Sequence, residues 1–499
     1  MISVLPLTIV AYDAEIANPL FTSQTIFLGK IIGFITLFSL VGLLISKKLN
    51  VTVRKIDAIL FILLVYIIVN RYFIQNDFGF SLRFIELLFL SVFYFFLRQI
   101  SLIHYLLFFL IISFTGLSQA VLGVLQFTGY YPSMHSSFRM TGNFFNPGPY
   151  GGFLAISGIC SMGLWLYKKE IISFLFKNSI NRKFSWCTIL KFLCNYLPST
   201  SAMAVLIVMP ATHSRAAIVA FTVGGLLLLI IKFKEAIVPR FNYFRKFGWK
   251  KKLIVHISLT GIILSICFGI YNIKKDSANG RLLIWRASVP LLLESPVFGI
   301  GYDKFQADYM IAQADFLRDV NNKNFESIAD NTLYAFNSAL QFIIENGIIG
   351  FLLFLPVFFF IKISPPDPTI YFGISIVSAI FVFGLFSYPF QILSIKIVFV
   401  ISLALLSLFS DSVISNSSLL NKHYQIKILI ITLIGCFGVY YTYTILNKLE
   451  NGFREWNNAN LMYHHENYLN SLQFYEKSLP VFMRNGEFLM QYGKALIMA

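Results

Sequence analysis

Residues 105–127 read YLLFFLIISFTGLSQAVLGVLQF and contain no charged side chain. An apolar run of about 20 residues is long enough to cross the hydrocarbon core of a bilayer as an α-helix. The same character extends through the whole chain, because 57% of its 499 residues are hydrophobic, 13% are charged and the mean hydropathy is +0.72. Soluble domains carry about 25% charged residues. The sequence therefore predicts an all-α polytopic membrane protein, and it excludes a soluble enzyme, a disordered chain and a disulfide scaffold.

Twelve apolar stretches of this kind predict about twelve transmembrane helices. They lie at residues 24–46, 56–73, 79–97, 105–127, 144–166, 192–211, 214–232, 253–272, 341–362, 369–388, 389–410 and 428–446. We expect a membrane domain over residues 1–446, which contains one long loop at 273–340, and a separate helical tail at 447–499. Alternation along the chain places this loop and this tail on the same side of the membrane.

The formal net charge of +17 is concentrated in three short segments. Residues 47–55, 167–191 and 232–252 carry four, six and eight basic residues, together 18 of the 40 lysines and arginines, beside two acidic residues. The long outer stretch 273–333 has seven basic and eight acidic residues. Basic loops stay in the cytoplasm, so this asymmetry predicts that the three segments are cytoplasmic and that the tail is extracytoplasmic. The charge thus indicates membrane orientation, and we expect no nucleic-acid partner.

The tail at 447–499 differs from the rest in having helical stripes of aromatic and small residues. One stripe holds Trp456, Ala459 and Tyr463, and a second holds Leu472, Tyr475 and Leu479. This pattern resembles one tetratricopeptide-type hairpin and the first helix of another. The alternative is an amphipathic tail that lies on the membrane. Because so few repeats do not form a stable solenoid alone, we expect the tail to dock on the membrane domain or on a partner protein.

Signatures of soluble enzymes are missing from the sequence. It contains no Walker A motif, no G-x-G-x-x-G, no H-E-x-x-H and no G-x-S-x-G. It also lacks an extracytoplasmic Asp-x-Asp pair, which would carry a divalent metal, and its five cysteines form no C-x-x-C motif. We therefore expect no metal ion, cofactor or disulfide framework.

Arginine is the residue type that points to chemistry. Four arginines lie near the predicted outer ends of helices, namely Arg139, Arg215, Arg281 and Arg286. A guanidinium at a membrane boundary is costly unless it snorkels, pairs or binds a ligand. Structural pairing is the expectation for Arg71, Arg83 and Glu86. Several converging arginines suit a diphosphate, because each planar guanidinium binds two phosphate oxygens, so these four predict a diphosphate site.

The stretch GNFFNPGPYGG at residues 142–152 is rich in helix-breaking residues and precedes a predicted span. A broken helix end frees backbone amides, which need partners inside a membrane protein. Beside a cavity, such an end binds an anion. A plain re-entrant turn is the alternative.

Four motifs in one order resemble the O-antigen ligase and polymerase family. They are RMTGNFFNPGPYGGFL at 139–154, HSRAAI at 213–218, GRLLIWRASVPLLLESPVFGIGYDKF at 280–305 and DNTLYAFNSALQFIIENGIIGFL at 330–352. The resemblance covers roughly residues 135–365. It implies a multi-pass protein of the bacterial inner membrane. It also implies metal-independent transfer of an oligosaccharide from undecaprenyl diphosphate to a hydroxyl acceptor at the outer face of that membrane.

The resemblance also assigns roles to individual residues. Arg215 matches the arginine that follows the family's serine, and Arg281 matches the arginine of its glycine-arginine pair; both imply diphosphate binding. Asn337 matches the asparagine of a catalytic histidine-asparagine pair. Glu345 and Gly347 match the glutamate and glycine that follow this pair.

One departure from the family pattern concerns the base. The family has histidine where this chain has Phe336, and phenylalanine accepts no proton. Other candidates for the base that activates the acceptor hydroxyl are His213, His135 and Glu345. An imidazole titrates nearest to neutral pH, which favours a histidine.

Several functions stay open at this point. The acceptor is a lipid core (a ligase), a lipid-linked repeat (an O-antigen or exopolysaccharide polymerase) or a protein (an O-oligosaccharyltransferase). A transporter or flippase of lipid-linked glycan is the interpretation from another class, and the charges of Lys30 and Lys396 within predicted spans favour it. A scaffold that has lost catalysis together with its histidine is a third.

Overall fold

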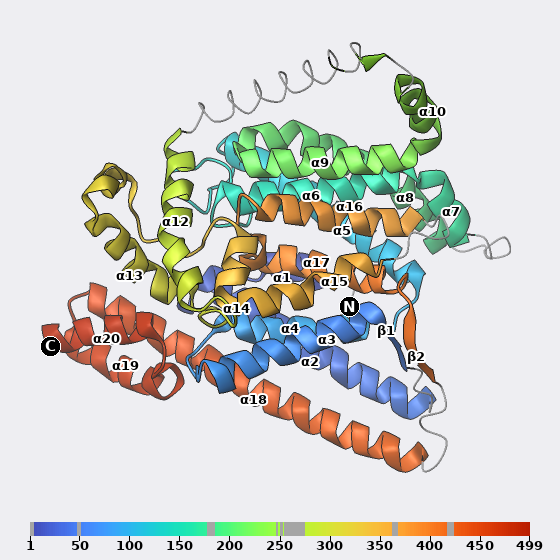
Figure 1. Cartoon of the computed structure of the whole chain (residues 1–499). Coiled ribbons are helices and arrows are strands. Elements are labelled where there is room, and N and C mark those ends of the chain that lie inside the picture. Colours follow the sequence, from blue (N-terminus) through green and yellow to red (C-terminus); the bar gives the residue numbers. More distant parts are fainter. Residues whose placement is uncertain are drawn as a thin grey trace.

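The computed structural model describes residues 4–46, 51–176, 185–245, 248–249, 253, 275–361, 368–416 and 424–499. The protein is an all-α polytopic membrane protein, as predicted (Figure 1). Eight helices among the described residues are long and apolar enough to cross a membrane, and α16 and α17 (Pro368–Gly384 and Leu393–Ser407) are shorter apolar helices.

Each predicted span that falls within the described residues coincides with a helix. The helices of the bundle are α2 (Pro19–Ser46), α3 (Lys55–Val69), α4 (Leu82–Leu97), α5 (Leu102–Phe127), α6 (Pro147–Leu166), α8 (Ser185–Val208), α9 (Arg215–Lys232), α14 (Ser338–Phe354), α16, α17 and α18 (Tyr424–His464). Short segments extend or join them, namely α1 (Val4–Val10), η1 (Asn70–Ile74), η2 (Met209–Thr212), α15 (Pro356–Phe359) and η4 (Pro389–Gln391). The predicted span 253–272 lies outside the described residues, apart from Leu253.

The two ends of the bundle differ in the way that the charge pattern predicts. One end carries α7 (Lys168–Phe176), α10 (Lys234–Arg245) and the strands β1 (Val51–Arg54) and β2 (Ser412–Asn416), which pair antiparallel with Val51 opposite Asn416. The other end carries α12 (Lys275–Glu294), α13 (Phe305–Arg318), η3 (Val320–Ile328), α19 (Tyr468–Phe482) and α20 (Gly486–Met498) (Figure 1). Residues 47–50, 177–184, 246–247 and 250–252 of the basic segments lie outside the described residues. We call the end with α12 and α19 the outer end.

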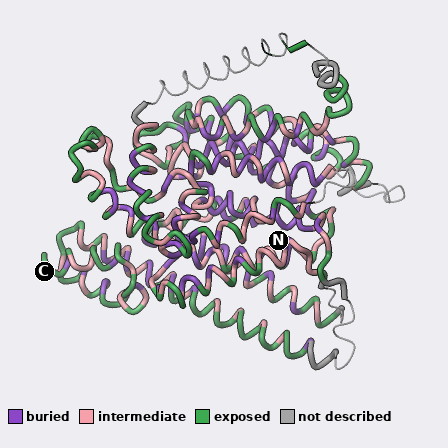
Figure 2. Tube along the Cα trace, in the orientation of Figure 1, coloured by how far each residue is buried: buried purple, intermediate pink, exposed green. Residues whose placement is uncertain are grey.

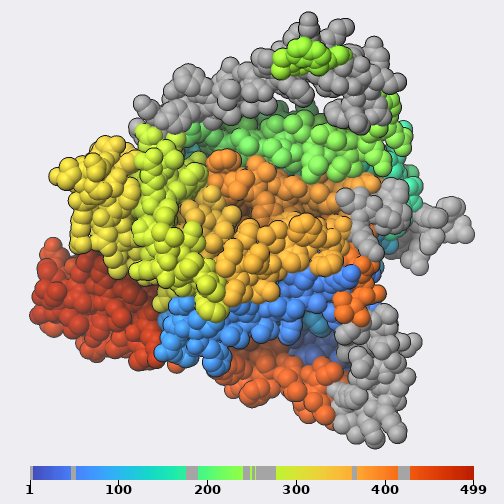
Figure 3. Space-filling view, in the orientation of Figure 1, coloured from blue at the N-terminus to red at the C-terminus, as the bar shows by residue number. Residues whose placement is uncertain are grey.

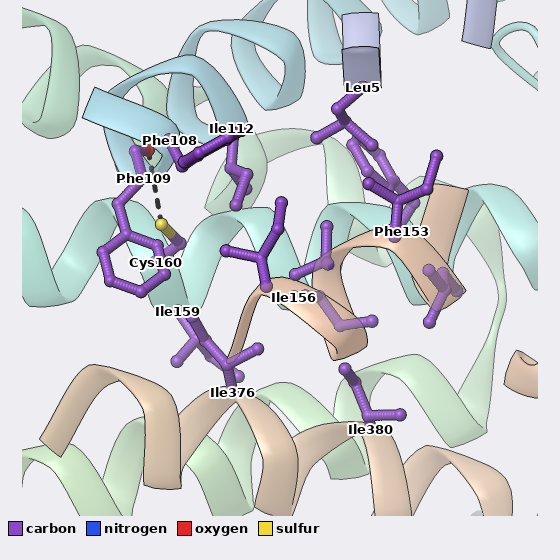
Figure 4. Close-up of a cluster of buried hydrophobic side chains, with 14 of the residues drawn as sticks. Leu5, Phe108, Phe109, Ile112, Phe153, Ile156, Ile159, Cys160, Ile376 and Ile380 are labelled. Atoms are coloured by element: carbon purple, nitrogen blue, oxygen red, sulfur yellow. Dashed lines mark hydrogen bonds between the residues drawn. The ribbon is translucent and has the colours of Figure 1, made fainter. Parts of the chain in front are cut away.

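The core of the bundle lies around α6, which is buried along most of its length (Figure 2). Phe153, Ile156 and Ile159 of α6 pack between α5 and α16, and the Cys160 thiol donates a hydrogen bond to the Phe109 carbonyl at 3.3 Å (Figure 4). Helix α6 can be apolar on all sides because other helices surround it. In contrast, α18 exposes large apolar side chains such as Ile434 and Phe437, as expected of a helix that faces lipid.

The long outer loop contains short helices, as predicted. Ile284 and Leu291 of α12 pack with Phe305 and Tyr309 of α13, and the same buried cluster includes Ile344 of α14. The loop is thus a small layer of helices that packs directly on a helix of the bundle.

The tail docks on the membrane domain. Helix α18 runs without a break past residue 447, and its outer part packs with α19 and α20 around Trp456, Phe482 and Phe488. The Phe482 ring also contacts the ring of Phe80, just before α4, with the ring centres 5.3 Å apart. In addition, the Ala17 amide donates a hydrogen bond to the Phe453 carbonyl at 3.1 Å. Figure 3 shows the tail against the N-terminal part of the chain. The tetratricopeptide-like character of the tail stays a prediction.

Candidate functional site

Arg215 and Arg281 both lie at the outer end of the bundle, close enough for their charges to interact. Arg215 is the first residue of α9, and Arg281 lies on α12 of the outer loop. Burial, followed by the nearby positive charge of Arg215, lowers the pKa of Arg281. Like charges near each other repel, and a bound anion relieves that repulsion. The site therefore combines one cation from the bundle with one from the loop.

A cluster of aromatic rings lies beside the Arg281 guanidinium. The guanidinium carbon lies 5.7 Å from the centre of the Phe336 ring. The Phe336 and Tyr388 rings pack edge to face, with their centres 5.0 Å apart. Tyr388 also stacks on the rings of Tyr334 and Phe145, with ring centres 4.6 and 6.4 Å from its own. Tyr388 thereby joins the loop before α6, the segment before α14 and the segment after α16. No charge or motif marks Tyr388 in the sequence, so sequence reasoning missed it.

Three helices begin around these rings. Asn146 caps α6 by accepting from the Gly148 amide, and Asn337 caps α14 by accepting from the Ala339 and Leu340 amides. The start of α9 lies against α6, since a Cβ on Gly151 would lie 2.8 Å from the Ser214 Cβ. Helix N-termini carry partial positive charge and favour anions. The break predicted at residues 142–152 is therefore the capped start of α6, on the same side as the two arginines.

A cavity of about 250 Å³ opens beside Arg281. Its lining comes from α12, α13, the last residue of η3 and the segment between η3 and α14, and consists of Ser277, Gly280, Arg281, Leu283, Ile284, Gln313, Ile328, Asp330, Thr332 and Phe336. Phe336 adopts φ +50°, a region that non-glycine residues rarely occupy and in which histidine is more frequent than phenylalanine. Phe336, the position at which the family resemblance predicts a histidine, thus lies in the wall of this cavity together with Arg281.

Glu345 lies in a separate buried cluster. Its side chain is fully buried, and Arg83 Nη1 donates to both of its oxygens at 2.8 Å. The Gln341 amide donates to the same carboxylate at 2.9 Å. Arg83 Nη1 also lies 3.5 Å from Asp303 Oδ1. The Arg83 guanidinium carbon lies 4.6 Å from the centre of the Tyr302 ring. The structure thus gives Glu345 a set of packing and ion-pair contacts, and it confirms the structural pairing expected for Arg83.

The other charges predicted within spans are paired as well. Arg71 lies 3.3 Å from Asp77, and Lys396 of α17 forms an ion pair with Glu86 of α4. Lys30 pairs with Glu450 of α18. These charges join helices to one another, so they no longer favour a transporter.

Helix α14 is broken at Gly347, whose φ is +65° and ψ is −175°. The backbone of the outer loop fills the break: the Ile300 and Gly301 amides donate to the Ile344 and Glu345 carbonyls at 2.9 and 3.0 Å. In return, the Ile348 amide donates to the Pro296 carbonyl at 3.0 Å. The loop that carries Arg281 is therefore joined to the bundle through the main chain.

The remaining predicted residues lie at different distances from this centre. His213 is exposed on the turn two residues before Arg215, with φ +51°. Arg286 points to η3, where its guanidinium carbon lies 5.6 Å from the Phe325 ring. Arg139 is exposed in the loop before α6, and the His135 ring packs on Phe138 at 4.7 Å. Within the described residues, no group of three or more His, Cys, Asp or Glu side chains is placed to hold a metal ion.

Comparison with known proteins supports a family assignment for the chain. Residues 200–355 match the family described as O-antigen ligase, which supports assignment of the chain to the O-antigen ligase and polymerase family. The matched region begins in α8 and ends just after α14, so it contains Arg215, Arg281, Phe336 and Glu345. No curated protein matches the chain.

Proposed function

We propose that this member of the O-antigen ligase and polymerase family transfers an oligosaccharide from undecaprenyl diphosphate to a hydroxyl acceptor at the outer face of the bacterial inner membrane. The family match supports glycosyl transfer in a membrane. The observation that carries the finer proposal is a cavity at the outer end that Arg281 lines, with Arg215 close enough to Arg281 for their charges to interact. A diphosphate ester is the leaving group that two guanidinium groups and three helix N-termini stabilise best.

The proposed reaction is a single displacement at the anomeric carbon. The acceptor oxygen attacks the face opposite the departing diphosphate, so the configuration inverts. Negative charge grows on the diphosphate as the bond breaks, and Arg215 and Arg281 stabilise it from fixed positions in a site of low dielectric. In this mechanism the arginines supply the positive charge, and the step needs no metal ion.

The remaining predicted residues take supporting roles in this proposal. Arg286 and Arg139 attract the anionic donor from the rim of the site. Asn337 orders the start of α14 as its helix cap, and Glu345 positions α4 against α14 through Arg83. His213 stays a candidate base on the turn next to Arg215. Many exposed residues of the bundle (Figure 2) are large apolar side chains, and these accommodate the polyprenyl chain.

The geometry does not distinguish the acceptors, and a lipid core, a lipid-linked repeat or a protein each fits a site that opens outward. The docked tail favours a protein acceptor or partner, because helical repeats bind other chains. Detection of core-attached glycan, laddered lipid-linked glycan or glycosylated protein in cells that express the chain separates the three.

The test of the function uses arginine substitutions in the full-length protein. Arg215→Ala and Arg281→Ala should each lower glycan transfer in membranes by about 100-fold or more, since each removes a fixed charge on the leaving group. Arg318→Ala is the matched control, because Arg318 lies in the same outer loop but is exposed and pairs with Asp315 on its own helix. Folding is checked by gel filtration and thermal unfolding in detergent. Full transfer by both folded site variants would contradict the proposal.

A further inference from the structure

The proposed transfer needs a group that removes the proton from the acceptor hydroxyl, and Phe336 occupies the family's position for that group. The cavity beside Phe336 holds a second ionisable side chain. Asp330 lines the same cavity as Arg281, and these two are the charged residues among those that line it. Its place in the sequence gave no signal, because the outer loop has nearly balanced charge and Asp330 belongs to no pair of closely spaced carboxylates.

The local structure fixes the position of Asp330. Its carbonyl accepts a hydrogen bond at 3.4 Å from the buried Gln313 of α13, whose side chain in turn accepts from the Tyr309 hydroxyl at 2.8 Å. One carboxylate oxygen accepts from the Asn331 amide at 2.7 Å, which orients the group. Asp330 is exposed where it lines the cavity, so a substrate hydroxyl can reach its other oxygen.

The charges in the cavity are arranged for a displacement. No ion pair within 4.0 Å joins Asp330 to Arg281 among the described residues, although both line one cavity. The neighbours that shift the pKa of Arg281 are Arg215 and Tyr388, on the side of the bundle. Base and leaving group must lie on opposite faces of the anomeric carbon for inversion, so the base must be a group other than the arginines that bind the diphosphate. The cavity offers one group of each kind, the Arg281 guanidinium for the anion and the Asp330 carboxylate for the proton.

We propose that Asp330 is the base of the transfer; this inference rests on the proposed function. The Asp330 carboxylate takes the proton of the acceptor hydroxyl as the acceptor oxygen bonds to the anomeric carbon. The bond between that carbon and the diphosphate oxygen breaks, and its electron pair leaves with the lipid diphosphate. Asp330 then releases the proton to water, so no oxidant, reductant or metal enters the step.

The other candidates fit this role less well. Both oxygens of Glu345 accept from Arg83, and the side chain is fully buried. His213 lies two residues from Arg215, on the side where the leaving group binds, while the base belongs on the opposite face of the sugar. Asp330 is the candidate that shares the cavity with Phe336.

The test compares Asp330→Asn with a variant that restores the family's base. Asp330→Asn keeps the oxygen that accepts from Asn331 and should lower kcat by about 100-fold or more with little change in KM. Adding Phe336→His to Asp330→Asn should recover at least about tenfold of that loss and give a pH–rate limb near 6.5, the ordinary pKa of histidine. Asp315→Asn, an exposed carboxylate of the same loop outside the cavity, should leave kcat unchanged.

The outcomes separate this inference from the proposed function. Full activity of Asp330→Asn, together with loss in Arg215→Ala and Arg281→Ala, would overturn the role of Asp330 and leave the transferase standing. Loss of transfer activity in His213→Ala, with full activity in Asp330→Asn, would assign the proton transfer to His213 and would also overturn the role of Asp330. Full activity in all of these variants would overturn the roles of Arg215, Arg281 and Asp330 together, whereas no transfer by the unmodified protein would overturn the proposed function.

Discussion

Arg83 and Glu345 form a buried ion pair in the outer half of the bundle, where the loss of one partner leaves an uncompensated charge. We expect Arg83→Ala to lower the free energy of unfolding by roughly 3 kcal/mol or more. The measurement is thermal or denaturant unfolding in detergent. The double variant Arg83→Met with Glu345→Leu should recover most of the loss, because it removes both charges and keeps most of the volume.

Glycan transfer by the same double variant tests the role of Glu345. If Glu345 positions helices, the folded double variant transfers glycan. A well-folded but inactive double variant would instead return Glu345 to the candidate bases, since it would show that the carboxylate matters beyond the ion pair.

Individual residues were predictable from the sequence where they are unusual in their surroundings. Arg215 and Arg281 carry guanidinium groups at predicted membrane boundaries. A charge is energetically costly there, and this made both residues candidates from the sequence alone. Tyr388 and Asp330 have no such mark, because an aromatic residue beside a span and an acid in a loop of balanced charge are both ordinary. Their importance comes from tertiary contacts with Phe336 and Gln313.

At the scale of elements, the break in α14 is the feature most sensitive to a small change. A Cβ on Gly347 would collide with the Val297 carbonyl, and φ is +65° there. Gly347→Ala should therefore lower the free energy of unfolding by more than about 2 kcal/mol. Gly438→Ala in α18 is the control, because nothing among the described residues lies within 4 Å of the place that its Cβ would take; it should keep or raise stability by up to about 1 kcal/mol. Equal unfolding midpoints for the two variants would contradict the described break.

Hydropathy located the spans well, because length and apolar content are local properties of the sequence. It did not reveal the break at Gly347, since residues 341–362 are apolar on both sides of that position. The segment that fills the break, around Gly299, lies about fifty residues earlier in the chain. A pairing between distant backbones has no signature in local periodicity.

For the whole molecule, the orientation in the membrane is the prediction that the function depends on. In a cysteine-free background, Ile497→Cys in the exposed tail should react with a membrane-impermeant maleimide applied from outside. Lys234→Cys at the start of α10 should react only after the membrane is opened, because the positive-inside rule predicts that the basic end faces the cytoplasm. The reverse pattern of labelling would place the arginine site on the wrong side for an extracytoplasmic transfer.

The main-chain hydrogen bonds between residues 296–301 and the two halves of α14 also limit how the protein can be divided. A chimera that received the outer loop of a relative without the matching helix would leave amides and carbonyls at Gly347 without partners inside the membrane, which costs several kcal/mol for each group. The loop is thus no interchangeable appendage. Acceptor preference, if it resides in this loop, can be exchanged between relatives only as one block that runs from α12 through α14.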